Sequence, residues 1–230
     1  MRIMRASCFI FALALLAAGT ATGQRGPMGQ MGPNMTSPQF RGVLNPVVGS
    51  GAAYEVVDAQ GMKSEMEVSI VAKEDVGGKQ GYWMEMGVSS SQSGSPMYMK
   101  TLMVVDGKNA SVTRMIMQPP GMAPMELPMQ GMGAMQQPAA TDVRDSAEKV
   151  GAESITTPAG TFSCDHYRAK DGSWDAWVAP KAGPWGLVKS TTHDATMTVT
   201  RVITNATDHI TGTPQAMDPA QMMRGMGRGR

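Results

Sequence analysis

Apolar and polar residues alternate along much of the chain between residues 52 and 204. The alternation is clearest over residues 65–70, where methionine, valine and isoleucine take every second position, and over residues 82–86. A period of two is typical of a β-strand with one buried face, because successive side chains point to opposite faces. Further strands are predicted over residues 52–59, 97–105, 109–117, 152–157, 161–169, 173–179, 186–192 and 195–204.

The predicted strands are short, and glycine-containing turns such as Asp171-Gly172 separate them. Because helical periodicity is absent between most of them, the pattern favours an antiparallel meander over a parallel sheet. One short helix is predicted over residues 141–150, with Thr141 or Asp142 as its N-cap. The predicted fold class is therefore mainly β, with little helix.

Composition divides the chain into segments. Residues 24–50 and 211–230 are rich in Gly and Met, and we predict that both are disordered, flexible ends. Residues 118–140 carry five prolines, which exclude a central strand and a continuous helix. We therefore expect a β-rich domain over residues 51–210 with a long Met/Pro-rich loop at 118–140.

The first 23 residues have the features of a cleavable signal peptide. Arg2 and Arg5 supply the positive start, residues 9–18 form an apolar run, and small residues follow up to Gly23. The run is shorter than the roughly 20 residues that a spanning helix needs. We therefore expect a periplasmic or extracellular protein with no transmembrane segment after cleavage.

Charge and cysteine content narrow the class of protein further. Loss of Arg2 and Arg5 leaves 18 basic residues against 19 acidic ones, so no strong field remains to attract nucleic acid. Cys164 is the only cysteine beyond the signal, which excludes an internal disulfide and a cysteine-rich zinc site. The chain has no nucleophile elbow, metalloprotease motif or phosphate-binding loop, so we expect that it is not an enzyme.

Three short motifs near the C-terminal end carry a resemblance. They are Thr157-Pro158-Ala159-Gly160-Thr161-Phe162, Trp177-Val178-Ala179-Pro180 and Gly186-Leu187-Val188-Lys189. The matching stretch, residues 155–204, resembles bacterial envelope proteins that are similar in architecture to the outer-membrane lipoprotein carrier group. That resemblance implies a single curved antiparallel sheet, or incomplete barrel, with a concave face.

The resemblance also implies a binding or carrier protein for an apolar ligand, such as a lipid or a lipoprotein. Large aromatic and thioether side chains at strand positions either pack in the core or line a cavity. Because little helix is predicted to cover the concave face, we expect a loop, a ligand or an envelope partner to close it. The expected ligand-binding residues on this face are Tyr82, Met84, Met86, Trp177 and Trp185.

Methionine is unusually abundant, with 24 residues against only 7 leucines. The loop at 118–140 holds a cluster with three M-x-x-M spacings, formed by Met122, Met125, Met129, Met132 and Met135. Thioethers are soft, uncharged ligands that suit Cu(I) and Ag(I), so a soft metal ion is the alternative ligand prediction. The same side chains also serve as a pliable apolar surface or as a reversible oxidation sink.

Cys164 and His166 form a second candidate metal-binding pair. They lie two residues apart on a predicted strand, so their side chains share a face and could hold one ion or pair as thiolate and imidazolium. The competing interpretation is that Cys164 is a small buried apolar residue. A third functional hypothesis treats the chain as a structural or interaction protein of the envelope, with the Met-rich loop and tails facing a partner.

Overall fold

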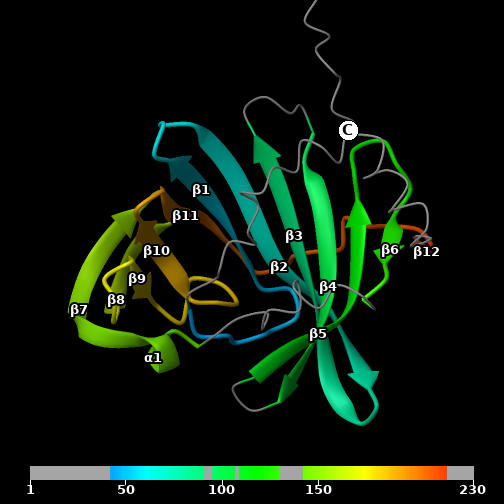
Figure 1. Cartoon of the computed structure of the whole chain (residues 1–230), viewed down its shortest axis with the longest axis horizontal. Coiled ribbons are helices and arrows are strands. Elements are labelled where there is room, and N and C mark those ends of the chain that lie inside the picture. Colours follow the sequence, from blue (N-terminus) through cyan, green and yellow to red (C-terminus); the bar gives the residue numbers. More distant parts are fainter. Residues whose placement is uncertain (1–41, 91–94, 107–108, 130–141, 217–230) are drawn as a thin grey trace, which may run out of the picture. The chain divides into compact units, whose positions relative to one another are not determined.

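The computed structural model describes residues 42–90, 95–106, 109–129 and 142–216. These residues form one open twelve-stranded sheet with the order β12-β6-β5-β4-β3-β2-β1-β11-β10-β9-β8-β7 (Figure 1). The elements are β1 (Gly51–Asp58), β2 (Lys63–Val76), β3 (Lys79–Ser90), β4 (Met97–Asp106), β5 (Asn109–Gln118), β6 (Met125–Leu127), α1 (Val143–Ser146), β7 (Ala147–Thr157), β8 (Gly160–Ala169), β9 (Trp174–Val178), β10 (Leu187–Thr192), β11 (Ala195–Ile203) and β12 (Gln215–Ala216). The predicted mainly β fold is confirmed.

Two antiparallel meanders, β1–β6 and β7–β11, make up the sheet, and the pairing of β1 with β11 joins them. Among the described strands, β12 and β6 form the one parallel pair. Tight turns connect the meander strands. At the β8–β9 turn, Gly172 has a φ of 72°, which favours glycine, and the Asp171 carboxylate accepts a hydrogen bond from the Ser173 N–H.

The β7–β11 end of the sheet is curved. Four steps of strand pairing separate β7 from β11, yet the two strands come into contact again. The curved end and β1–β4 share the larger apolar core. Its fully buried side chains include Tyr54, Val68, Ile70, Met103, Val143, Trp185, Leu187, Val188 and Val199.

Trp185 lies in the β9–β10 connection and seals this core with no exposed surface. Backbone hydrogen bonds fix the connection against the segment that precedes β1. The Val43 N–H donates to the Trp185 carbonyl at 2.9 Å, and the Asn45 N–H donates to the Pro184 carbonyl at 2.7 Å. Residues 42–50, which we expected to belong to a flexible leader, thus pack on the sheet.

A second, smaller core lies on the opposite face of β3–β5. It contains Trp83, Leu102, Ile116 and Ile210. Because Trp83 alternates with Met84, the two faces of β3 contribute to different cores. Ile210 belongs to the segment of residues 204–214, here called the strap, which runs from β11 to β12 across this outer face (Figure 1).

Three local expectations differ from the structure. The predicted helix over residues 141–150 is limited to α1, with Asp142 as its N-cap, because residues from Ala147 onward pair with β8. Strand pairing outweighs local helix propensity there. Within the predicted 118–140 loop, β6 pairs with β5, and within the predicted tail, β12 pairs with β6.

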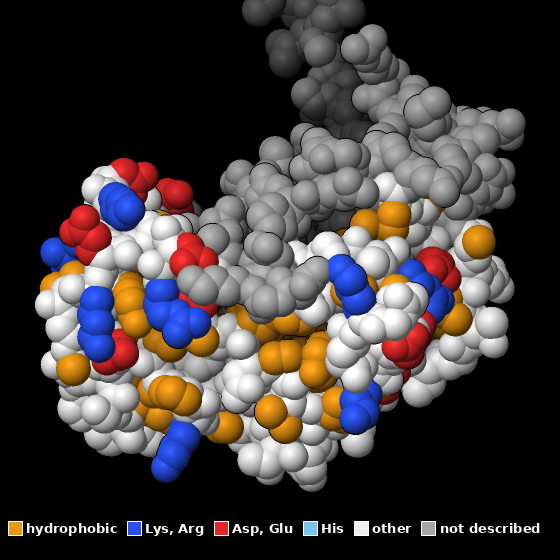
Figure 2. All heavy atoms as spheres, turned by 90° about the horizontal axis from the view of Figure 1, so that it is seen from below, with side chains coloured by type: hydrophobic (Ala, Val, Ile, Leu, Met, Phe, Trp, Pro, Cys, Tyr) orange, Lys and Arg blue, Asp and Glu red, His pale blue; other side chains and the backbone are white. Residues whose placement is uncertain are grey.

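Acidic and basic side chains are interspersed around apolar patches on the face shown in Figure 2. This mixture agrees with the nearly balanced charge of the sequence. Within the described ranges, no helix is both long enough and apolar enough to cross a membrane. The predicted signal peptide lies outside these ranges.

Candidate metal site: a ladder of methionines

Four methionines lie directly opposite one another on four neighbouring strands. Met86 on β3 pairs with Met99 on β4, Met99 pairs with Met117 on β5, and Met117 pairs with Met125 on β6. Directly opposed residues of an antiparallel pair share a face, with Cβ atoms about 4.5–5.5 Å apart. The four side chains therefore form a continuous row, here called the methionine ladder.

A neighbouring row on the same face adds further polarisable and polar groups. Met84 pairs with Thr101, which pairs with Met115. The Thr101 hydroxyl is buried, and among the described residues it has no hydrogen-bond partner. A buried hydroxyl normally finds a partner, so Thr101 is an unsatisfied polar group beside the methionine ladder.

Burial differs along the methionine ladder. Met86 and Met117 are 7% and 6% exposed, whereas Met99 and Met125 are only half-buried. Met86 belongs to the larger core and Met99 packs against it. Burial thus alternates along the ladder, and its partly exposed members are Met99 and Met125.

The methionine ladder contains residues from two different sites that the sequence predicted. Met86 was expected to bind an apolar ligand and Met125 was expected to bind a metal, and the structure places both in one ladder. Met122 is 48% exposed in the turn before β6, and Met129 is half-buried beyond it. Met132 and Met135 lie outside the described residues.

The remaining predicted ligand-binding residues divide between different environments. Tyr82 and Met84 contribute to the larger core, where Met84 is 8% exposed. Trp185 is completely buried there, which leaves it no surface for a ligand. Trp177 is half-buried on β9, where it packs against the larger core and also stacks on His166 in a polar cluster.

Cys164 is buried in the larger core, with its thiol 3.6 Å from the Phe162 carbonyl. Burial raises the pKa of the Cys164 thiol to about 11, and the charge of Glu153 adds to the rise. A metal-binding cysteine must lose its proton, so this environment opposes the thiolate. The geometry favours the interpretation of Cys164 as a small apolar residue.

His166 is held by two carboxylates and an indole ring. Its Nδ1 lies 2.9 Å from Glu153 Oε1, and its Nε2 lies 2.6 Å from Asp175 Oδ1. Its ring stacks on Trp177 at 4.4 Å, and Trp177 Nε1 donates to Glu153 at 2.6 Å. Both ring nitrogens are engaged, so neither offers a free lone pair to a metal ion.

Asp175 completes this cluster. Burial raises its pKa, but hydrogen bonds from His166 and Arg168 outweigh that effect and hold the pKa below its usual value. The cluster ties β7, β8 and β9 together. No group of three or more His, Cys, Asp or Glu side chains suited to a metal ion occurs within the described part of the chain.

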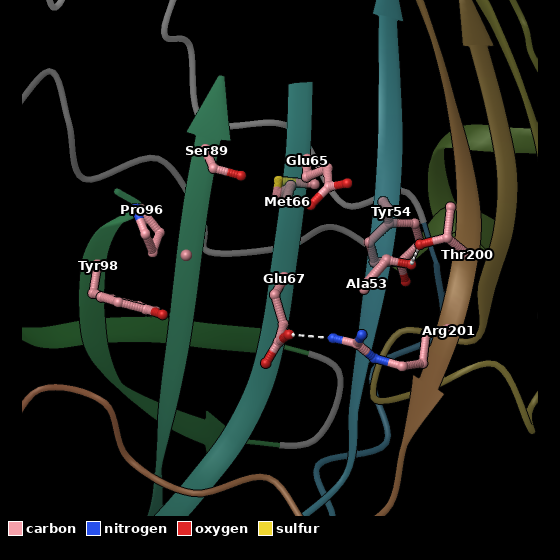
Figure 3. A pocket seen from close by; sticks show the side chains of 11 residues that line it. Ala53, Tyr54, Glu65, Met66, Glu67, Ser89, Pro96, Tyr98, Thr200 and Arg201 are labelled. Carbon is pink, nitrogen blue, oxygen red and sulfur yellow. Dashed lines mark hydrogen bonds and ion pairs between the residues drawn. The ribbon is translucent and has the colours of Figure 1, made fainter. Parts of the chain in front are cut away.

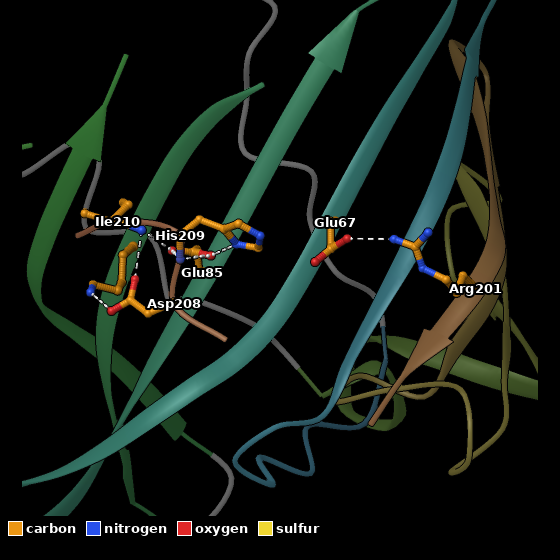
Figure 4. Close-up of polar contacts among 7 residues, drawn as sticks. Glu67, Glu85, Arg201, Asp208, His209 and Ile210 are labelled. Atoms are coloured by element: carbon orange, nitrogen blue, oxygen red, sulfur yellow. Dashed lines mark hydrogen bonds and ion pairs between the residues drawn. The ribbon is translucent and has the colours of Figure 1, made fainter. Parts of the chain in front are cut away.

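On the outer face, a buried carboxylate fixes the strap to β3 (Figure 4). Glu85 is 3% exposed and accepts hydrogen bonds from the His209 and Ile210 backbone N–H groups at 3.0 and 3.1 Å. His209 Nδ1 lies 2.6 Å from the same carboxylate. Asp208 accepts a hydrogen bond from the Lys100 ammonium, so an ion pair also anchors the strap to β4.

Sequence reasoning missed Met99 and Met117 as site residues, as well as the Glu85 contacts. A usable signal existed for the methionines, because Met97 and Met99 on one predicted strand, and Met115 and Met117 on the next, recur with the period of a strand. Only the register shows that these pairs meet. The Glu85 contacts join residues more than 120 positions apart and have no local signal.

No protein-family model matches the chain, and no curated protein matches it. Among solved structures, a candidate lipoprotein from Parabacteroides distasonis is 14% identical, with a TM-score of 0.40, covering 70% of this chain and 98% of its own. A candidate exported protein with YmcC-like fold from Bacteroides fragilis is 12% identical, with a TM-score of 0.39, covering 70% of this chain and 99% of its own. Likeness this distant assigns neither a family nor a function, so membership of the lipoprotein carrier group stays a prediction.

Proposed function

We propose that this chain is an exported, non-catalytic protein that binds a soft monovalent metal ion, Cu(I) or Ag(I), through the methionine ladder. The observation that carries the proposal is the direct pairing of Met86, Met99, Met117 and Met125 across four strands. Export rests on the predicted signal peptide.

Thioether chemistry fits such an ion for three reasons. Sulfur is soft and polarisable, as Cu(I) and Ag(I) prefer, and it needs no deprotonation to bind. The thioethers add no charge of their own, so the half-buried face is neutral without the ion and carries only the ion's single positive charge when it is bound. Methionine has three rotatable side-chain bonds, so neighbouring sulfurs can converge on one ion without moving the backbone.

The proposal is tested by competition for Cu(I) against a chromophoric chelator under reducing, oxygen-free conditions. The ladder variant carries Met→Leu at positions 86, 99, 117 and 125. The loop variant carries Met→Leu at positions 122, 129, 132 and 135, and serves as the matched control with the same number of substitutions. We expect the ladder variant to lose Cu(I) and the loop variant to keep it.

Leucine conserves apolar volume, and such exchanges usually cost less than about 1.5 kcal/mol each, so the fold is expected to persist. Urea unfolding of both variants checks this point. Equal Cu(I) affinity in the ladder variant and the unsubstituted protein would refute the proposal. Loss of binding only in the loop variant would move the metal to the M-x-x-M cluster instead.

A second candidate is the apolar ligand implied by the resemblance. It is supported by half-buried Met97, Met99, Met115 and Met125, which continue the apolar face of the sheet beyond the sealed core. The ladder variant separates the two candidates, because leucine keeps the apolar surface and removes the thioethers. An adduct of lipid mass retained by the ladder variant in native mass spectrometry would support the apolar ligand.

A further inference from the structure

A groove of about 230 Å³ crosses the outer face of β1–β4 and β11 (Figure 3). Its polar lining includes Glu65 and Glu67 on β2 and Arg201 on β11, and Pro96 and Tyr98 form its apolar wall. Glu67 alternates with the core residues of β2, so the groove opens on the face opposite the methionine ladder. It is therefore a separate site.

Small residues make the hollow. Gly87 and Ala53 lie among the lining residues, and neither has a side chain long enough to fill the space between Tyr98 and Arg201. A Cβ at Gly87 would lie 2.8 Å from Tyr98 Cε1, so only glycine leaves room for this ring across β3. The Tyr98 ring also stacks on His209 at 4.6 Å, with 7° between the ring planes. The aromatic wall is thus held in place before any ligand arrives.

The groove carries an excess of negative charge. Arg201 donates to Glu67 at 3.0 Å and neutralises it, whereas Glu65 is exposed and has no ion-pair partner among the described residues. Two carboxylates against one guanidinium leave a formal charge of −1. Burial raises the pKa of Tyr98, and the charges of Glu67 and Glu85 raise it further, as expected where the local potential is negative.

We infer that this groove binds a small organic cation, a primary ammonium or guanidinium group on a short apolar stem. Glu65 would accept charge-assisted hydrogen bonds from the cationic head, while the stem lies along Tyr98 and Pro96. Pockets for drug-sized ligands are about 300–1,000 Å³, so this smaller groove suits a stem of a few carbon atoms. The inference does not depend on metal binding at the ladder.

The probe is butylguanidinium. Its binding to the ¹⁵N-labelled chain is measured by NMR as the chemical-shift change of the Gly87 backbone amide. Butanol and butyrate are the neutral and anionic counterparts with stems of similar length. We expect saturable shifts with butylguanidinium and none with the other two. Equal shifts with butanol would reduce the site to an apolar patch, and absence of any saturable shift up to about 100-fold ligand excess would overturn the inference.

Two substitutions give opposite expectations. Glu65→Gln removes the unpaired carboxylate and should weaken butylguanidinium binding about fivefold, the scale of one exposed ion pair. Arg201→Gln releases Glu67 for the ligand and should strengthen binding about as much. Glu148→Gln, an exposed change on β7, is the matched control and should leave affinity unchanged.

Weaker binding in Arg201→Gln would contradict a cation site, because an anion site loses affinity when the guanidinium is removed. Urea unfolding of each variant excludes loss of fold as the cause. The ladder variant should bind butylguanidinium like the unsubstituted protein. Its loss of Cu(I) and its binding in the groove are therefore independent results, and either proposal can fail alone.

Discussion

Both halves of the sheet consist of strands in which apolar and polar residues alternate. Their inner faces, however, are covered to different extents. In the curved half, β7–β11, the fully buried Trp185 and the segment around Val43 cover the core. In β3–β6, the same face carries the methionine ladder, and two of its four side chains remain half-buried. A face sealed by a rigid aromatic side chain serves stability, whereas a face of flexible thioethers can still receive a ligand.

The outer faces differ as well. Around His166, short contacts with Glu153 and Asp175 fill the polar cluster of the curved half. On β1–β4, small residues leave a groove, and the strap covers only the part around Glu85. This difference assigns stability mainly to the curved half and binding mainly to β1–β6, and the predictions below test that division.

The largest expected effect is the loss of the Trp185 seal. Trp185→Ala removes a side chain with no exposed surface, and such truncations cost about 3–5 kcal/mol in the free energy of unfolding. Urea denaturation followed by circular dichroism measures the change. Trp177→Ala is the matched control, because Trp177 is half-buried and should cost clearly less. Equal losses of unfolding free energy in Trp185→Ala and Trp177→Ala would show that the stability of the curved half does not depend on the burial of Trp185.

An intermediate loss of unfolding free energy is expected when one glycine in each half of the sheet is replaced by alanine. Gly183 has a φ of 91°, and a Cβ there would lie 2.8 Å from Ala52 Cβ and 3.0 Å from the Gly51 carbonyl oxygen. Gly183→Ala should therefore cost about 2–3 kcal/mol through strain and overpacking. At Gly87 the Cβ would meet side-chain atoms of Tyr98 and no backbone, so displacing that ring from its stack on His209 is expected to cost less, about 1 kcal/mol.

Urea unfolding of both alanine variants measures this difference. The groove supplies a second readout, since displacement of Tyr98 in Gly87→Ala should weaken butylguanidinium binding while Gly183→Ala leaves it unchanged. A larger stability loss for Gly87→Ala than for Gly183→Ala would reverse the assignment of rigidity to the curved half.

Sequence patterns predicted the strands well because the period of two is a local property of each segment. They failed at residues 147–150, where helix propensity is also local but pairing with β8 decides the outcome. The proposed metal site was predicted only in part, since Met125 was recognised by its M-x-x-M spacing and Met99 was not. Register is a tertiary property, so no local pattern shows that Met99 faces Met117.

The smallest expected effect is a pH-dependent change in unfolding free energy that arises from Glu85, the residue that attaches the strap to β3. Burial raises the pKa of Glu85 above its usual value, although its hydrogen bonds with His209 act in the opposite direction. The folded state therefore favours the protonated form more than the unfolded state does. The stability that Glu85 contributes is fully present below the usual glutamate pKa of about 4.3 and is lost as the pH rises through the raised pKa.

Glu85→Gln removes this titration and keeps a side chain of similar size. When the pH falls from 7 to 5, the unsubstituted protein should gain free energy of unfolding relative to Glu85→Gln, as measured by urea titration at both pH values. Glu148→Gln, exposed on β7, should show no such relative change. If the unsubstituted protein instead loses stability relative to Glu85→Gln on acidification, the His209 contact outweighs burial. The charged Glu85 carboxylate would then hold the strap to the outer face of β3.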